Sequence, residues 1–450
     1  MEAFSKQMQS LLLANPHSAL VSKPNVSHQI VEETRRKVLG LFKADPKRFD
    51  IVFVANATAG IKLVAEAFSG YSQGFDYYYH RDCHTSLVGQ SDAYTLLDVA
   101  ALVSTNPLDL SDHLAAPDFI VLSFYKMFGF PDLGALIVRK PAAHVFEHRK
   151  YFGGGTTEIT VTGQPWHMRK EKALSSRLED GTGATHSILA LSCAIGTYRG
   201  AFGGFEDVSK HTGWLAKCLY EKLAGMKHVD GSPVCRIYKD PASTYGDART
   251  QGATVTFNIR GMDGNWASAA KAGAMAAARD IHIRTGSLCN PAGMACALGL
   301  TADDYQRAYA SGFRCNSDQD VMNGIPTGMV RVSFGAMSAL SDVEAFVRFM
   351  GDCFVEKAGQ ASEPTLVTNV ANVSEGGEES LQYSEHSAGS SLHRVKSITS
   401  DTARSAHQFA RPRVPSPCLP PRPEPKGRSG EQDRVHLRLK GQPNHSNELG

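Results

Sequence analysis

The chain has 450 residues, and its formal net charge of +2 at pH 7 is close to balance. This length provides enough core for one large or two to three ordinary domains, while the balanced charge argues against nucleic acid or an anionic membrane surface as a partner. Nine scattered cysteines form no Cys-x-x-Cys pair, which favours a reducing compartment over a disulfide scaffold or a structural metal site. No apolar run reaches membrane length, so the sequence predicts a cytoplasmic protein outside the membrane.

The first elements expected are two helices, at 2–13 and 28–42, where apolar residues recur at helical spacing. Residues 51–54 form a short apolar run typical of a buried strand, and the helical pattern resumes at 61–68. Thr58 and small residues lie where this strand turns into the helix. Free backbone N–H groups and the helix dipole favour a phosphate at such a position. A simple helix cap is an equally open interpretation of Thr58.

Two polar residues accompany the next segments. His84 follows the aromatic run 77–79 and is able to stack on a planar cofactor, although a lone histidine is more often structural. Asp98 is the one acid in the apolar segment 95–102. A carboxylate buried in a strand needs a partner, and a pyridinium nitrogen would suit it.

The apolar run 119–124 predicts a buried parallel strand, and Lys126 follows it. A lysine there lies at the carboxyl end of a strand, where open α/β sheets bind ligands. Among Phe124, Phe128 and Phe130 we expect it to be desolvated, and therefore able to form an imine with an aldehyde cofactor. The alternative is an ordinary solvated lysine. A phosphate site, a stacking histidine, a buried acid and this lysine together indicate a pyridoxal-phosphate site.

Seven segments carry a family resemblance: 15–18, 59–68, 84–89, 104–110, 123–131, 151–155 and 177–182. They resemble the class V aminotransferase group of fold type I pyridoxal 5'-phosphate (PLP) enzymes, which includes cysteine desulfurases. Within that group the chain is most similar to the N-terminal desulfurase domain of molybdenum cofactor sulfurases, over about residues 10–355. The resemblance implies that Lys126 is the Schiff-base lysine, Asp98 the partner of the pyridine nitrogen and His84 the stacking ring.

The resemblance also implies which residues hold the phosphate. Ala57, Thr58 and Ser123 would bind it within the chain. Gly181 and Thr182 would reach the phosphate of the opposite subunit, which implies a homodimer; a simple turn is the alternative for these two residues.

The second half of the chain contains two further candidates, Cys289 and Arg331. The spacing Arg-x-Gly-x-x-Cys at 284–289 resembles the sulfur-accepting loop of cysteine desulfurases, so Cys289 is the candidate persulfide carrier, whereas composition alone favours a small buried cysteine. Cys296 is a weaker candidate. Arg331 lies in a short strand, and its planar guanidinium suits the α-carboxylate of an amino acid. A surface salt bridge is the alternative.

We expect an α/β fold of type I, with a mostly parallel sheet between helices. The predicted PLP-binding large domain is 1–200, the small α+β domain is 201–357, and 358–450 is a disordered tail. Compared with the family, the chain has no first strand, no C-terminal cofactor-binding (MOSC) domain and a much shorter segment between His84 and Asp98. We therefore expect this chain, as written, to be a poor or inactive catalyst with low cofactor occupancy and low solubility.

The predicted function is that of a PLP-dependent L-cysteine desulfurase that sulfurates the molybdenum cofactor of molybdenum hydroxylases through a persulfide on Cys289. One alternative is a class V carbon–sulfur lyase or aminotransferase of small-molecule metabolism, which would not need Cys289. Others are an inactive truncated remnant and a binding module acting through its proline- and arginine-rich tail.

Overall fold

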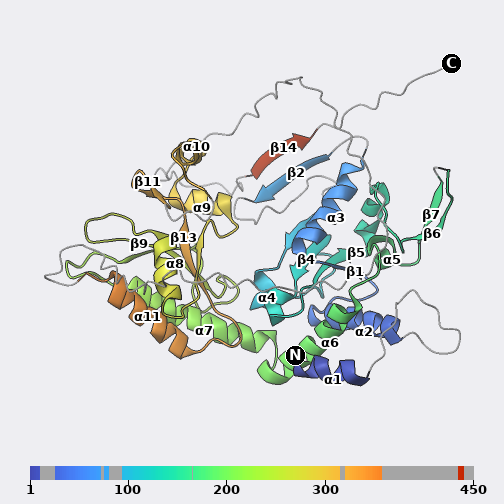
Figure 1. Cartoon of the computed structure of the whole chain (residues 1–450), viewed down its shortest axis with the longest axis horizontal. Helices are drawn as coiled ribbons and strands as arrows, with labels where there is room; N and C mark the ends of the chain where they lie inside the picture. The colour runs from blue at the N-terminus through green and yellow to red at the C-terminus, as the bar shows by residue number, and fades with distance from the viewer. Residues whose placement is uncertain are drawn as a thin grey trace, which may run out of the picture. The chain divides into compact units, whose positions relative to one another are not determined.

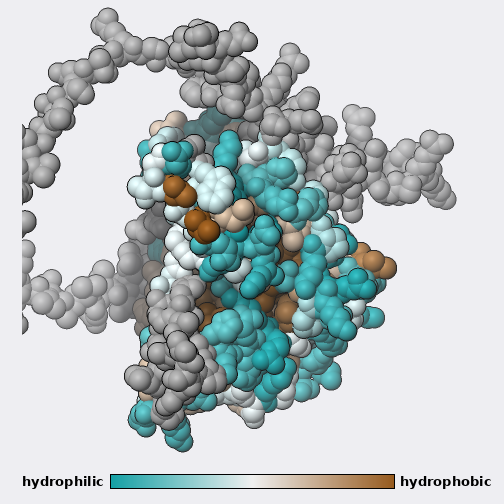
Figure 2. Space-filling view, turned by 90° about the vertical axis from the view of Figure 1, so that its right-hand side faces the viewer, coloured by the Kyte–Doolittle hydropathy of each residue, from teal (hydrophilic) through white to brown (hydrophobic). Residues whose placement is uncertain are grey.

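The computed structural model (Figure 1) describes residues 1–10, 26–71, 75–80, 94–164, 166–314, 320–356 and 434–439. Among these residues, no helix is long and apolar enough to span a membrane. The face shown in Figure 2 is mainly hydrophilic where it is described, and its hydrophobic areas are small and separate.

The larger sheet has the strand order β1 (Phe49–Val54), β5 (Gly134–Arg139), β4 (Phe119–Ser123) and β3 (Leu96–Asp98). Because β5 is antiparallel to both neighbours and β3 is parallel to β4, the strands β1, β4 and β3 run in one direction. Every residue of β4 is buried, as expected for a strand covered on both faces. The carboxyl ends of three strands therefore lie along one edge of this sheet.

Helices cover both faces of the larger sheet (Figure 1). On one face, Ile120 and Leu122 of β4 belong to a core shared with α2 (Val26–Leu41) and α6 (Thr185–Phe202). On the other face, the alternate residues Phe119 and Val121 belong to a core shared with α3 (Ala57–Ser69) and the 3-10 helix η2 (Lys140–His148). This alternation follows from the two-residue period of a strand, and it fixes which side of β4 each helix packs against.

The smaller sheet is antiparallel throughout, with the order β10 (Arg284–Gly286), β13 (Met329–Ser333), β9 (Thr254–Ile259) and β8 (Cys235–Tyr238). One face packs into a core with three helices: α7 (Phe205–Ala224), α8 (Ala269–Ala277) and α11 (Leu340–Phe354). The other face carries polar side chains.

The remaining described elements are short: α1 (Glu2–Ser10), η1 (Leu102–Ser104), α4 (Tyr125–Phe128), β6 (Thr157–Thr160), β7 (His167–Arg169), α5 (Leu174–Leu178), α9 (Pro291–Leu298), α10 (Ala302–Ala310), β11 (Val321–Met322) and β12 (Ile325–Pro326). The α/β fold with a mostly parallel sheet and a second α+β region is confirmed.

One strand lies inside the predicted disordered tail. β14 (Arg434–Leu439) pairs antiparallel with β2 (Phe75–His80). The segment alternates apolar and polar residues, a pattern typical of a strand, and it lies within the tail for which composition predicts disorder. The remainder of the predicted tail lies outside the described residues, and the domain boundaries stay predictions.

Candidate active site

A cradle of backbone and hydroxyl groups forms where β1 turns into α3. The Ala57 N–H donates to the Ser123 hydroxyl oxygen over 2.9 Å, which joins the start of α3 to the end of β4. Gly134 lies between these strand ends, paired with both Val54 and Ser123. A Cβ on Gly134 would be 2.6 Å from the Asn56 Cα, so only glycine allows this close approach. We call Ala57, Thr58 and Ser123 the phosphate cradle.

The donors that remain free in the cradle fit a phosphate. Asn56 caps α3 by accepting from the Ala59 N–H over 3.0 Å, so Asn56, not Thr58, is the cap residue. Thr58 is exposed, and neither its N–H nor its hydroxyl has a hydrogen-bond partner in the described part of the chain. Because Ser123 accepts from Ala57, its own proton is available to donate. Three donors at a helix N-terminus suit the PLP phosphate.

Lys126 lies three residues after Ser123, in the first turn of α4. Its side chain is exposed, which contradicts the expected desolvation. The reason is that the neighbouring rings point elsewhere: Phe124 is fully buried in the core, and Phe128 packs edge-on against Tyr198 at 5.3 Å between ring centroids. Phe130 is itself 39% exposed. Lys126 therefore stands at the carboxyl edge of the sheet with solvent around its amine.

Asp98 ends β3, the strand next to β4, and pairs with Val121. It is half-buried, and its carboxylate accepts from the Ala100 N–H over 2.9 Å. Asp98, Ser123 and the start of α3 thus come from strand ends on the same edge of the sheet. The predicted stacking residue, His84, lies outside the described residues, as does most of the short segment between His84 and Asp98.

The segment containing Gly181 and Thr182 is fastened by two buried arginines that sequence reasoning missed. Arg35 of α2 makes a bidentate pair with Glu179, at 2.6 and 2.5 Å, and Glu179 also accepts from the Phe53 N–H of β1. Their distance in sequence, 144 residues, left no local signal of this pair.

Arg149 holds the next residue of this segment, because its guanidinium donates to the Asp180 carboxylate over 2.8 Å. Gly181 adopts a left-handed φ of 75°, and Thr182 is exposed. A cavity of about 790 Å³ has Thr182, Ala55 and Ala59 in its lining. Thr182 therefore shares a cavity with Ala55 and Ala59, which flank the cradle residues Ala57 and Thr58 in the same chain. Its contribution to an opposite subunit stays a prediction.

In the smaller sheet, Arg331 of β13 lies directly opposite Arg284 of β10. Arg331 is half-buried, makes no ion pair with a described carboxylate, and its buried Nε has no hydrogen-bond partner within the described ranges. Burial and the neighbouring charge of Arg284 lower the pKa of Arg331, while Cys289 acts in the opposite direction. An unpartnered guanidinium beside a second cation favours a bound anion, and the surface salt bridge weighed from the sequence is absent among these residues.

Cys289 is exposed, as the sulfur-accepting loop requires, rather than buried. The Arg284 Nη2 contacts its sulfur at 2.5 Å. Leu288 and Cys289 both have φ of 57°, which is uncommon for residues with a side chain. We call residues 284–289 the cysteine loop. The strand register therefore places the candidate carboxylate clamp, Arg331, beside the arginine that holds the candidate sulfur carrier.

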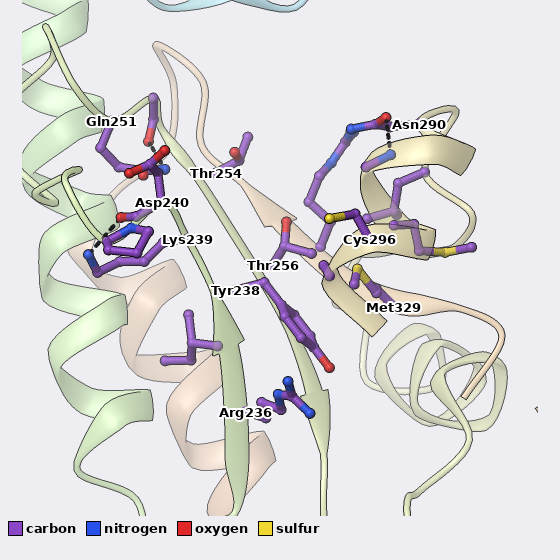
Figure 3. A pocket seen from close by; sticks show the side chains of 18 residues that line it. Arg236, Tyr238, Lys239, Asp240, Gln251, Thr254, Thr256, Asn290, Cys296 and Met329 are labelled. Atoms are coloured by element: carbon purple, nitrogen blue, oxygen red, sulfur yellow. Dashed lines mark hydrogen bonds between the residues drawn. The ribbon is translucent and has the colours of Figure 1, made fainter. Parts of the chain in front are cut away.

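Arg331 and Cys296 line a cavity of about 940 Å³ on the polar face of the smaller sheet (Figure 3). Lys126 is not in this lining. The structure thus brings the predicted residues into two groups, the cradle with Lys126 and Asp98, and Arg331 with Cys289. The catalytic roles of all these residues stay predictions.

Known proteins resemble the chain in sequence and fold. The profile of the aminotransferase class-V family matches residues 84–346. A molybdenum cofactor sulfurase of Aspergillus clavatus is 44% identical over 437 residues, which cover 83% of this chain and 51% of that protein. One of Neurospora crassa is 43% identical over 425 residues, which cover 79% of this chain and 45% of that protein. The chain spans about half the length of these curated relatives.

Among solved structures, the apo cysteine desulfurase of Thermococcus onnurineus NA1 aligns with a TM-score of 0.56 and 17% identity, over 78% of this chain and 90% of that one. The cysteine desulfurase CsdA of Escherichia coli aligns with a TM-score of 0.54 and 17% identity, with the same coverage. At this identity the likeness shows the fold. With its family profile matching more than half of its residues, the chain belongs to the aminotransferase class-V family.

Proposed function

We propose that this chain is a PLP-dependent L-cysteine desulfurase that carries sulfur on Cys289 for the sulfuration of the molybdenum cofactor. The observation that supports it most is the register of β10 and β13, which sets Arg331 opposite Arg284, the residue whose guanidinium contacts the Cys289 sulfur. A carboxylate clamp and a sulfur carrier side by side suit an amino acid that bears a thiol.

The cradle would hold the cofactor. Thr58 offers its N–H and hydroxyl, and Ser123 offers its hydroxyl proton, to the phosphate, while Asp98 lies at the same edge of the sheet to pair with the ring nitrogen. When bound, PLP supplies an electron sink that weakens bonds at the substrate α- and β-carbons. Lys126, at the end of the same strand as Ser123, would hold the cofactor aldehyde and then move protons on the substrate.

Arg331 would orient the substrate. Its fork of N–H donors matches the two oxygens of the cysteine carboxylate. Its Nε is buried and unpaired within the described residues, so substrate binding would supply a missing partner. The neighbouring Arg284 adds positive charge on the same side, which favours an anionic ligand.

Cys289 would then take the sulfur. Its thiolate, paired with the Arg284 guanidinium, attacks the substrate sulfur. An S–S bond forms on Cys289 as the substrate C–S bond breaks, the electron pair of that bond stays with the carbon, and protonation of the carbon completes alanine. After the transfer, the positive charge of Arg284 would stabilise the persulfide anion on Cys289.

The acceptor and assembly rest on the relatives. The 43–44% identity to molybdenum cofactor sulfurases supports transfer of the persulfide sulfur to the molybdenum cofactor, free or bound in a molybdenum hydroxylase. A homodimer that brings Gly181 and Thr182 to the opposite phosphate belongs to the same proposal. The cytoplasmic location expected from the sequence stays a prediction.

The test is a comparison of alanine and persulfide yields in two cysteine variants. With saturating PLP and L-cysteine, Cys289→Ser should form neither alanine at the normal rate nor a protein persulfide. Cys296→Ser, altered seven residues further on, is the matched control and should form both. Undiminished sulfide or alanine release by Cys289→Ser would favour the carbon–sulfur lyase instead.

A further inference from the structure

The polar face of the smaller sheet carries one row of side chains that runs across all four strands. Tyr238 of β8 lies opposite Thr256 of β9, Thr256 lies opposite Arg331 of β13, and Arg331 lies opposite Arg284 of β10. Side chains opposite one another on antiparallel strands share a face. The row therefore begins at the cysteine loop, passes the proposed carboxylate clamp and ends at Tyr238.

The cavity on this face extends well beyond the clamp. Its lining includes Arg331 at one part and Arg236, Tyr238 and Lys239 of the β8 side at another. Its volume of about 940 Å³ is at the upper end of pockets that hold drug-sized ligands, roughly 300–1,000 Å³. Cysteine is far smaller than such a ligand. The part of the cavity around β8 therefore has room for a second molecule.

The β8 part of the cavity offers hydrogen-bond donors that have no partner in the described part of the chain. Arg236 is exposed and makes no ion pair with a carboxylate among the described residues; its guanidinium carbon lies 5.3 Å from the centroid of the Tyr238 ring. The Tyr238 hydroxyl oxygen is buried and unpaired within the same ranges. Burial raises the pKa of Tyr238 to about 12, so the phenol is a neutral donor at physiological pH. Thr256, opposite Tyr238, adds a hydroxyl to this set.

The charges of the cavity are separated along its length. Lys239, Asp240 and Gln251 gather at one end, and Arg236 lies at the other, with Tyr238 between (Figure 3). Lys239 is already bonded to the carbonyl oxygens of Asp240 and Ser243, and the Asp240 carboxylate accepts from the Ala242 N–H. The Arg236 end is therefore cationic, and its donors have no partner among the residues that the structure describes.

We propose that Arg236 and Tyr238 form a second anion subsite, which takes the phosphate group of a small phosphate-bearing molecule. A guanidinium, a phenol and a hydroxyl are all donors, and a phosphate offers more acceptor oxygens to such a set than a carboxylate does. The assignment of this molecule as the sulfur acceptor rests on the proposed function; the anion subsite itself does not.

The strand spacing allows this subsite and the clamp to be filled at once. Tyr238 is two strands away from Arg331 in the row, and neighbouring strands are about 4.8 Å apart, so the two backbones are roughly 10 Å apart. A phosphate at Arg236 and a carboxylate at Arg331 would therefore not compete for one guanidinium. The acceptor would lie on the same face as the row that leads to Cys289.

The experiment measures phosphate binding to the full chain saturated with PLP, so that the phosphate cradle is occupied. Isothermal titration with inorganic phosphate and with glycerol 3-phosphate would be carried out in a phosphate-free buffer. Arg236→Gln should weaken both affinities about tenfold or more, because it removes a charge-assisted donor pair. Arg249→Gln is the matched control, since Arg249 is an exposed arginine of the same region outside the cavity lining, and should leave both unchanged.

A second variant distinguishes a loss of phosphate binding from a loss of folding. Tyr238→Phe keeps the ring and removes only the unpaired hydroxyl, so its melting temperature without phosphate should be unchanged or higher. Its affinity for phosphate should fall by about threefold. Equal phosphate affinities of the wild type, Arg236→Gln and Tyr238→Phe would overturn the proposal. Binding of inorganic phosphate but not of glycerol 3-phosphate would also overturn it.

The outcomes separate the two proposals. Phosphate binding that depends on Arg236, in a chain that forms no alanine from cysteine, would overturn the proposed function and support the subsite. If the chain forms alanine and a Cys289 persulfide but Arg236→Gln does not change its phosphate affinity, the proposed function is supported and the subsite is overturned.

Discussion

The phosphate cradle and the cysteine loop are built by different forces. The cradle rests on fully packed strands: Ser123 is buried at the end of β4, and Gly134 brings the Asn56 backbone into contact with the sheet. In the cysteine loop, Arg284 and Cys289 are exposed, Gly286, Leu288 and Cys289 have positive φ, and the Arg284 guanidinium contacts the Cys289 sulfur. A cofactor that stays bound needs a fixed site, whereas a sulfur carrier must reach both a donor and an acceptor.

This difference predicts where each kind of change will be seen. Substitutions of the packed residues that build the cradle and the adjoining turn should alter folding stability, whereas substitutions of the exposed Thr58 and Lys126 should alter cofactor binding and chemistry. Substitutions around the cysteine loop should alter chemistry with little effect on unfolding, because few buried groups are involved.

The largest effect is expected at Lys126. Lys126→Ala removes the amine at the end of β4, and alanine formation should fall by about 10²–10⁴-fold or more, the contribution typical of a positioned proton-transfer group. Because the side chain is exposed, the unfolding midpoint should not change. Lys62→Ala, another exposed lysine, is the control. A PLP adduct mapped by mass spectrometry to Lys62 or Lys140 would contradict the assignment.

A change of stability without chemistry is expected at Arg35, which supports the Gly181–Thr182 turn. Arg35→Met leaves the half-buried Glu179 without its bidentate partner, so the free energy of unfolding should fall by about 3 kcal/mol, the lower end of the cost of breaking a buried pair. Urea denaturation measures it. Arg36→Met changes the exposed neighbour in the same helix and should alter stability by less than about 0.5 kcal/mol. Equal stabilities of the two variants would show that the pair does not fasten the turn.

The opposite pattern is expected at Arg331. Arg331→Lys keeps a positive charge but loses the planar fork, so the KM for cysteine should rise about tenfold. The unfolding midpoint should stay within error, since the guanidinium has no ion pair among the described residues. Steady-state alanine formation provides the KM. An unchanged KM would remove Arg331 from the substrate site.

The smallest effect is expected at the helix cap. Asn56→Ala removes the acceptor of the Ala59 N–H and should lower the free energy of unfolding by about 1 kcal/mol. Thr58→Ala should leave stability nearly unchanged and weaken PLP binding, which fluorescence titration measures. If Thr58→Ala destabilised the chain as much as Asn56→Ala, Thr58 would be a structural residue rather than a phosphate donor.

Sequence reasoning was strongest where short-range pattern determines structure. The apolar runs before Thr58 and Lys126 identified the strands that place both residues at one sheet edge. It failed where tertiary packing decides. Phe124 and Phe128 pack into the core and Phe130 is exposed, so none of the three rings desolvates Lys126, and no local pattern distinguishes these directions.

Sequence reasoning also could not predict contacts between residues that are distant in the sequence. Glu179 pairs with Arg35, which lies 144 residues away in the sequence. Arg331 lies opposite Arg284 only because of the register of β13 and β10.

The most direct test of the account is to locate the sulfur after reaction with cysteine. The chain would be incubated with saturating PLP and L-cysteine, alkylated, digested and examined by mass spectrometry, while alanine is quantified in the same sample. We expect one additional sulfur atom on the peptide that contains Cys289, and alanine in equal amount. Alanine or sulfide formed in quantity while Cys289 carries no additional sulfur would contradict it.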